Sequence, residues 1–226
     1  MTKDRRIAVQ LEDISITYTR GDVSVEAVRG ISLDILQGEF VSIEGPSGSG
    51  KSSLLRAIAG LCEITSGDIR IGGNSISSLS NGQLADLRRT SIGFVHQLHN
   101  LFPDLTAAQN VALPLRLEGL SPDIINSRVD TALERLEIAS LKDRLPEELS
   151  GGEMLRVAVA RALAIEPLVI LADEPTGSLD QATGKNVLEI LRKLNGEGTT
   201  VVVVTHDEAI ASGAGRRVKI VDGRLA

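Results

Sequence analysis

One eight-residue stretch constrains the fold of this 226-residue chain more than any other segment. The sequence GPSGSGKS runs from Gly45 to Ser52, directly after the apolar run Phe40–Glu44 and before the helix-forming stretch Ser53–Ala59. A strand, a glycine-rich loop and a helix in this order are typical of phosphate-binding loops. Backbone N–H groups of such a loop wrap around phosphate oxygens, and the helix N-terminus adds the positive end of its dipole. We therefore expect an α/β fold that binds a nucleotide by its phosphates.

Two side chains at the end of this loop have separate expected roles. Lys51 offers a mobile point charge to the β- and γ-phosphates, and the hydroxyl of Ser52 is suited to binding Mg²⁺. A flexible Gly/Ser turn could match the pattern by accident, but it would not need a strand before it and a helix after it. The predicted nucleotide-binding residues of this segment are Gly45, Pro46, Ser47, Gly48, Ser49, Gly50, Lys51, Ser52 and Ser53.

Three short, continuous apolar runs predict the centre of the fold. They are Phe40–Glu44, Leu168–Ala172 and Thr200–Thr205, and a polar loop follows each of them. Strands that are apolar on both sides are typical of parallel sheets covered on both faces. With 42% hydrophobic residues, the chain can bury one substantial core around such a sheet.

Other segments predict a β layer and a helical region beside this sheet. Alternating, β-branched residues at Ile7–Tyr18, Val25–Ile35 and Ile69–Ile71 predict short antiparallel strands early in the chain. Helical spacing and strand-breaking charge fill Leu101–Ala164. We expect these parts to form one domain over residues 1–226.

Polar side chains follow two of the three apolar runs. Asp173 and Glu174 come directly after Leu168–Ala172, at the edge where α/β sheets bind their ligands. Asp173 is expected to serve Mg²⁺, and Glu174 to act as the general base on an attacking water. His206 ends another run in the same manner, where an imidazole could reach a γ-phosphate or polarise that water. Without a phosphate loop, the acidic pair would be interpreted as a solvated turn and the histidine as structural.

Composition excludes several other classes of protein. The formal net charge of −6 and the absence of basic tracts make nucleic acid an unexpected partner. Cys62 is the only cysteine, so an intrachain disulfide or a cysteine-based zinc site is not expected, and a reducing, cytoplasmic compartment is favoured. No segment approaches the ~18 apolar residues of a membrane span.

A short motif before the acidic pair gives the chain a family resemblance. The sequence LSGGE at Leu149–Glu153 resembles the signature motif of ATP-binding-cassette (ABC) ATPases, and it precedes Asp173 as that family requires. Alone, the same letters would indicate only a helix start with a serine cap. Further matches in family order are Tyr18 as the adenine-stacking aromatic, Gln97 as the Q-loop glutamine, Ser178–Asp180 as the D-loop and His206 as the switch histidine.

The resemblance implies a catalytic set and a shared ATP site. The implied catalytic residues are Glu174, His206 and Gln97, and the implied Mg²⁺ ligands are Ser52, Gln97 and Asp173. In a head-to-tail dimer, the signature segment of one chain would cap ATP held by the other, because a helix N-terminus offers free backbone donors to a γ-phosphate. The implied ATP-binding residues outside the phosphate loop are Tyr18, Ser150, Gly151, Gly152, Glu153 and Asp180.

The resemblance also implies a fold and a partner. The fold would be an α/β phosphate-loop NTPase of ABC type, with a mostly parallel core sheet, an N-terminal antiparallel β layer and an α-helical subdomain. The core and β layer would occupy about 1–94 and 165–226, and the helical subdomain about 95–164. A separate transmembrane permease would hold a homodimer or a pair of cassettes at the cytoplasmic face of the cell membrane.

One stretch points to a branch of this family. Ile92–Leu115 is similar to the ATPases of lipoprotein release, macrolide export and cell division, which are thought to transmit force. His96 and His99 lie on either side of Gln97 and differ from the residues usual in that branch. Either they make this loop sensitive to pH, or they are neutral changes in a loop that tolerates substitution. Two other functions remain open at this point: a soluble ABC ATPase acting on DNA or ribosomes, and a regulatory module that binds ATP without hydrolysing it.

Overall fold

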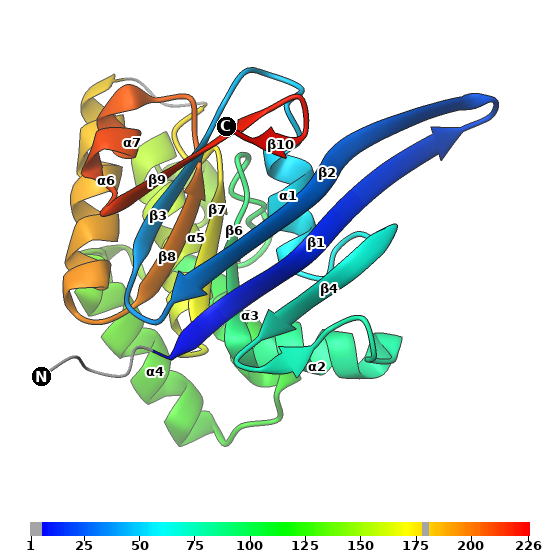
Figure 1. The fold of residues 1–226 in the computed structure, drawn as a ribbon. Coiled ribbons are helices and arrows are strands. Elements are labelled where there is room, and N and C mark those ends of the chain that lie inside the picture. The colour runs from blue at the N-terminus through cyan, green and yellow to red at the C-terminus, as the bar shows by residue number, and fades with distance from the viewer. Residues whose placement is uncertain (1–5, 178–180) are drawn as a thin grey trace, which may run out of the picture.

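The computed structural model describes residues 6–177 and 181–226, and they form two sheets with helices around them (Figure 1). The core sheet has the strand order β10-β9-β3-β8-β7-β6. All neighbours from β9 to β6 are parallel, and β10 pairs antiparallel with β9 at the edge. The strands are β3 (Phe40–Glu44), β6 (Ile92–Val95), β7 (Val169–Asp173), β8 (Thr200–Val204), β9 (Arg216–Val221) and β10 (Arg224–Leu225).

The three apolar runs of the sequence form adjacent strands of this sheet. Every residue of β7 and β8 is buried, and β3 is buried except for its last residue. Val41, Val202 and Leu171 face one hydrophobic cluster, whereas Val201 and Ile170 face the other, because side chains alternate across a strand. The predicted α/β fold with a mostly parallel core sheet is confirmed.

A second, antiparallel sheet lies beside the core sheet, with the order β2-β1-β4-β5. Its strands are β1 (Ile7–Arg20), β2 (Val23–Leu36), β4 (Ser66–Ile71) and β5 (Asn74–Ser75). The predicted segments Ile7–Tyr18 and Val25–Ile35 do form antiparallel strands, but these are not short, because each strand extends to 14 residues. Register shifts interrupt the pairing of the two strands at several points. Such irregularities increase the twist of the hairpin, and the strands continue past them.

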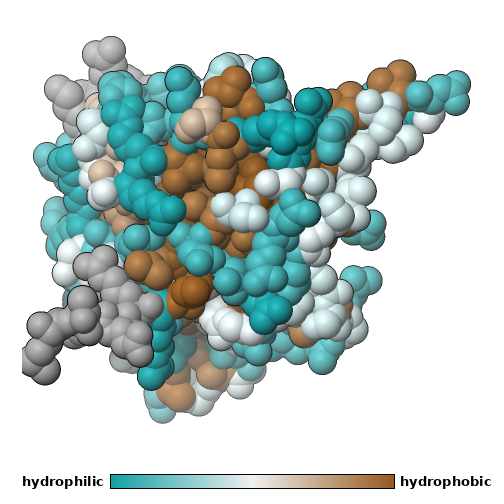
Figure 2. Space-filling view, viewed as in Figure 1, coloured by the Kyte–Doolittle hydropathy of each residue, from teal (hydrophilic) through white to brown (hydrophobic). Residues whose placement is uncertain are grey.

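The outer end of the β1–β2 hairpin extends away from the rest of the molecule (Figure 1). The space-filling view shows apolar residues close to this end within a largely polar surface (Figure 2). Val23 and Val25 belong to this part and are 65% and 57% exposed. The inner half of the hairpin, by contrast, packs its buried residues with the first helix in one hydrophobic cluster.

The helices cover both faces of the core sheet. Three of them begin with a reciprocal capping box, at Ser80, Thr106 and Ser150. One hydrophobic cluster contains apolar residues of α3 to α6, and the other contains those of α1. The helices are α1 (Lys51–Ile58), α2 (Asn81–Ser91), α3 (Ala107–Leu117), α4 (Pro122–Arg135), α5 (Gly151–Leu163), α6 (Gln181–Gly196) and α7 (Glu208–Gly213).

The predicted helical region holds α3, α4 and α5, which pack on each other. Two 3₁₀ turns, at Ala139–Leu141 and Pro146–Glu148, join α4 to α5. Within the described residues, no helix combines the length and the apolar character that crossing a membrane requires.

Candidate active site

The phosphate loop joins β3 to α1 at the carboxyl end of the parallel strands. Its glycines Gly45, Gly48 and Gly50 have φ values of +149°, +78° and +98°, a region that side-chain-bearing residues rarely adopt. Gly50 caps α1 without any side-chain hydrogen bond, so the first N–H groups of that helix keep their capacity to bind an anion.

The same loop is held tightly between two strands. A Cβ atom added to Gly45 would lie 2.0 Å from the carbonyl oxygen of Ile220 in β9. A Cβ atom on Gly50 would lie 2.0 Å from the carbonyl oxygen of Ala27 in β2. These two glycines are therefore required by the packing of the protein itself, in addition to the approach of a phosphate.

Lys51, the first residue of α1, is folded against the loop. Its side chain is buried, with the residue only 7% exposed, and its ammonium donates to the carbonyl oxygens of Gly45 at 2.9 Å and Pro46 at 2.7 Å. A buried cation needs such partners because desolvation is costly. The ammonium is thus held by two backbone carbonyl groups of the phosphate loop.

Ser52 and Asp173 meet although they lie 121 residues apart in the chain. The Ser52 hydroxyl donates to Oδ1 of Asp173 at 2.7 Å, because β7 ends beside the start of α1. A hydroxyl and a carboxylate are hard oxygen donors of the kind that Mg²⁺ prefers. Among the described residues, no group of three or more His, Cys, Asp or Glu side chains could hold a metal ion. The chemistry of this pair therefore fits a hard divalent cation such as Mg²⁺.

Glu174 and His206 form a second pair at the same sheet edge. His206 Nδ1 lies 2.7 Å from Oε2 of Glu174, and the side chains are 72% and 17% exposed. Glu174 has a φ of +47°, which is strained for a residue with a side chain. Its backbone N–H donates to the carbonyl oxygen of Val204 at 2.9 Å, which fixes the residue beside the strand that leads to His206.

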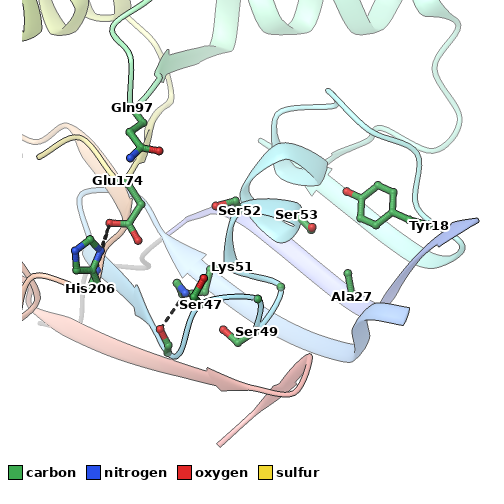
Figure 3. Close-up of a pocket in the computed structure, with 13 residues that line it drawn as sticks. Tyr18, Ala27, Ser47, Ser49, Lys51, Ser52, Ser53, Gln97, Glu174 and His206 are labelled. Carbon is green, nitrogen blue, oxygen red and sulfur yellow. Dashed lines mark hydrogen bonds and ion pairs between the residues drawn. The ribbon is translucent and has the colours of Figure 1, made fainter. Parts of the chain in front are cut away.

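These groups surround one cavity of about 630 Å³ (Figure 3). Tyr18 and Ala27 stand at one end, Glu174 and His206 stand at the other, and the phosphate loop lies between them. This order fits a nucleotide. The aromatic side chain at one end suits the base, and the cationic and amide donors further along suit the phosphates. The lining residues are Tyr18, Ala27, Gly45, Ser47, Gly48, Ser49, Gly50, Lys51, Ser52, Ser53, Gln97, Glu174 and His206.

Comparison with known proteins gives this arrangement a family. Residues 28–177 match the family described as ABC transporter. An uncharacterized ABC transporter ATP-binding protein of Thermotoga maritima is 46% identical over 220 residues, which cover 96% of this chain and 93% of that protein. The chain belongs to the ABC transporter family. It is an ATP-binding cassette, and ATP hydrolysis is the reaction of its site.

Solved cassettes support this membership. A dimeric structure of the cassette MJ0796 in a post-hydrolysis state, bound to ADP and Pi, has a TM-score of 0.87 and 42% identity, with 96% of each chain covered. The related MJ0796 protein is from Methanocaldococcus jannaschii. A macrolide export ATP-binding/permease protein, MacB of Mannheimia succiniciproducens, is 43% identical over 217 residues, but the chain spans only 34% of its length. The ABC fold and the predicted family are confirmed.

The cassette brings together most of the residues predicted from its sequence. Gln97, in the loop after β6, lies against the segment after Glu174, because a Cβ atom on Gly177 would lie 2.8 Å from Nε2 of Gln97. Pro46 is not among the lining residues and contributes its carbonyl oxygen to Lys51. Ala27 was missed, because a small residue in a strand gives no signal until its cross-strand neighbours are known.

The predicted signature residues lie outside this cavity. Ser150 caps α5, and its backbone N–H and hydroxyl donate to Oε2 of Glu153 at 2.8 Å and 2.7 Å. These two hydrogen bonds from Ser150 lower the pKa of the Glu153 carboxyl. Gly151 and Gly152 begin the helix without lining the nucleotide cavity of their own chain. Asp180, also predicted to bind ATP, lies outside the described residues.

Proposed function

We propose that this cassette drives a separate transmembrane permease, working as a dimer that encloses two Mg·ATP between its chains. The observation that carries the proposal is that two pairs of side chains, Ser52 with Asp173 and Glu174 with His206, meet beside the phosphate loop. One pair suits a cation on the phosphates, and the other suits activation of a water. Together they supply what hydrolysis of a γ-phosphate needs.

Each pair has an assigned role in this proposal. Ser52, Asp173 and Gln97 would hold Mg²⁺, which would supply positive charge to stabilise the transferred phosphoryl group. Glu174 orients the attacking water and accepts its proton, because its carboxylate is only 17% exposed and lines the cavity beside His206. His206 holds that carboxylate through Nδ1 and keeps its other ring nitrogen available for the γ-phosphate.

The dimer accounts for the position of the signature segment. Ser150 is exposed, and Gly151 and Gly152 are partly exposed at the N-terminus of α5, away from the cavity of their own chain. We propose that these residues and Glu153 close the cavity of a partner cassette, with backbone N–H groups directed at its γ-phosphate. The dimeric MJ0796 structures are support from relatives for this arrangement.

The permease and the branch of the family follow from relatives. MacB is named as an ATP-binding/permease protein, and a solved relative, cbiO1 from Clostridium perfringens, is described as part of the transporter complex cbiONQ. We propose that this chain works in the macrolide-export and lipoprotein-release branch, on the cytoplasmic face of the membrane. The division into a core (1–94 and 165–226) and a helical subdomain (95–164) belongs to the same proposal.

Glu174→Gln tests the catalytic assignment. The change keeps the shape of the side chain and removes its basicity, so turnover should fall about 10²-fold or more, the range of a general base. ATP binding should persist, and the variant should form an ATP-dependent dimer in size-exclusion chromatography. Glu189→Gln, which alters an exposed carboxylate on α6, is the matched control and should hydrolyse ATP at the normal rate. Normal phosphate release by Glu174→Gln would refute the assignment.

The permease assignment has its own test. A tagged cassette purified from detergent-solubilised membranes of its source cells should bring a membrane protein with it in fixed ratio. Recovery of the cassette alone, under conditions in which it hydrolyses ATP, would refute the transporter role without affecting the catalytic one.

A further inference from the structure

We propose that Arg217 is a positioning residue for ATP hydrolysis, because its guanidinium ties the segment that carries His206 to the end of the strand that carries the phosphate loop. The inference rests on the proposed role of His206. Arg217 belongs to β9 and is not among the residues that line the nucleotide cavity. It therefore acts through its neighbours rather than on the nucleotide.

One side of the guanidinium binds the end of β3. Nε donates to Oε1 of Glu44 at 2.7 Å, and Nη2 donates to Oε2 at 2.6 Å, so the carboxylate is held by two parallel hydrogen bonds. The hydroxyl of Ser42 donates to the same carboxylate at 2.8 Å. Hydrogen bonding from Arg217 lowers the pKa of the Glu44 carboxyl, so it stays ionised. Glu44 directly precedes Gly45, the first residue of the phosphate loop.

The other side of the guanidinium binds the start of α7. Nη1 donates to Oε1 of Glu208 at 2.7 Å, and Nη2 donates to Oε2 at 2.9 Å. Glu208 is the first residue of α7 and stands two positions after His206. One planar fork therefore fixes two carboxylates from different elements, which a lysine with its single ammonium cannot do in the same geometry.

A backbone hydrogen bond holds the same segment on its other side. The N–H of Thr205 donates to the carbonyl oxygen of Ile43 at 3.2 Å. His206 thus lies between two connections, and they lead to Ile43 and Glu44, the last two residues of β3. The His206 side chain is 72% exposed, so packing does little to fix it. The connection through Arg217 supplies a constraint that packing does not.

The energetics predict where the effect of Arg217 will be seen. Exposed ion pairs contribute little to the stability of a fold, and the side chains of Arg217 and Glu208 are 45% and 73% exposed. Catalytic geometry is far more sensitive, since a displacement of about 1 Å can lower a rate about 10²-fold. Loss of the connection should therefore lower turnover more clearly than it lowers the melting temperature.

Arg217→Met, with Arg216→Met as control, tests the proposal. Methionine keeps an apolar side chain of similar length and removes the guanidinium group. Arg216 is 43% exposed, and its guanidinium bonds the Asp34 carbonyl at 2.8 Å and lies 3.6 Å from Glu39, away from α7. We expect kcat of Arg217→Met to fall about fivefold, an effect of the size of one well-formed ion pair, with KM and nucleotide affinity unchanged. Arg216→Met should keep the wild-type kcat, and Arg217→Lys should recover only part of it.

The same substitution in a His206→Ala background shows whether Arg217 acts through the histidine. If it does, Arg217→Met has no further effect there, because the group it positions is missing. If the two substitutions instead lower kcat by independent factors that multiply, the proposal is overturned. It is also overturned if Arg217→Met has the same kcat as Arg216→Met, or if it raises KM and leaves kcat unchanged. A His206→Ala cassette with normal turnover would refute the proposed histidine role itself. Normal turnover in Arg217→Met beside a slow His206→Ala would refute the positioning role alone.

Discussion

The phosphate loop contains two glycines that make a direct test of its packing. Gly48 and Gly50 both have positive φ, +78° and +98°, so alanine at either position forces a side-chain-bearing residue into a left-handed conformation. That conformation costs about 1–2 kcal/mol for an L-residue. The two positions differ in their surroundings, because nothing lies within 4 Å of a Cβ atom at Gly48. Gly48→Ala therefore measures the backbone cost alone.

Gly50→Ala adds a steric conflict to the same backbone cost. The new Cβ atom would lie 2.0 Å from the carbonyl oxygen of Ala27 and 3.1 Å from its carbonyl carbon. Ordinary close C···O contacts are about 3.3 Å, so β2 or the loop would have to move by more than an ångström. Overpacking of this kind costs about 1–3 kcal/mol. Gly50→Ala should therefore be about 2 kcal/mol less stable than Gly48→Ala.

Thermal unfolding of the nucleotide-free protein measures this difference. For a chain of this length, 1 kcal/mol corresponds to about 2–4 °C, so Gly50→Ala should melt about 4–8 °C below Gly48→Ala. Nucleotide must be absent, because a ligand that binds only the folded state raises the Tm by its own affinity. Equal melting temperatures for the two variants would refute the reasoning that packing against Ala27 requires a glycine at position 50.

Two further outcomes are expected. Lys51→Ala should weaken ATP binding in a calorimetric titration, because it removes the buried ammonium from the phosphate loop, and unchanged affinity would contradict its role. His99 is 6% exposed and burial lowers its pKa, so the unfolded chain takes up a proton first as the pH falls below about 6.5. As the pH falls, the free energy of unfolding of the wild type should therefore decrease more steeply than that of His99→Asn, by up to about 1.4 kcal/mol per pH unit. Asparagine is the control because it tolerates the φ of +59° and does not titrate. Parallel stability curves in denaturant titrations from pH 7 to pH 5 would contradict this.

The parts of the fold that the sequence predicted are those with a local signal. β3 has the predicted bounds, and β7 lies within one residue of them, because an apolar run with no alternation can hardly form anything but a buried strand here. The outer ends of β1 and β2, after Tyr18 and before Val25, were not predicted, since exposed residues such as Val23 have no periodicity that marks a strand. At that end, the strands are formed by hydrogen bonding between β1 and β2 and not by burial of apolar side chains.

Contacts between residues far apart in the sequence also differ in whether the sequence carries a signal for them. The proximity of Ser52 and Asp173 was expected, because both follow strands whose carboxyl ends meet at one sheet edge. The fork of Arg217 on Glu44 and Glu208 had no such signal, since charged residues near strand ends are common and only the order β9-β3-β8 brings these three together. Topology had to be known before that contact could be recognised.

Backbone strain explains how two consecutive carboxylates serve different partners. Asp173 ends β7 and accepts a hydrogen bond from Ser52, whereas Glu174 meets His206. In a continuing strand, neighbouring side chains would point to opposite faces of the sheet. The φ of +47° at Glu174 turns the chain at this point, and it costs about 1–3 kcal/mol for a residue with a side chain.

That strain is held by hydrogen bonds on both sides of the residue. The N–H of Glu174 donates to the carbonyl oxygen of Val204 at 2.9 Å, and its own carbonyl oxygen accepts from the N–H of Gly177 at 3.0 Å. Glu174 therefore lines the cavity beside the imidazole of His206, while Asp173 lies beside the hydroxyl of Ser52. The strained turn at Glu174 thus separates two carboxylates that are adjacent in the sequence. This separation is what the proposed division of roles requires, with Asp173 as a cation ligand and Glu174 as a proton acceptor.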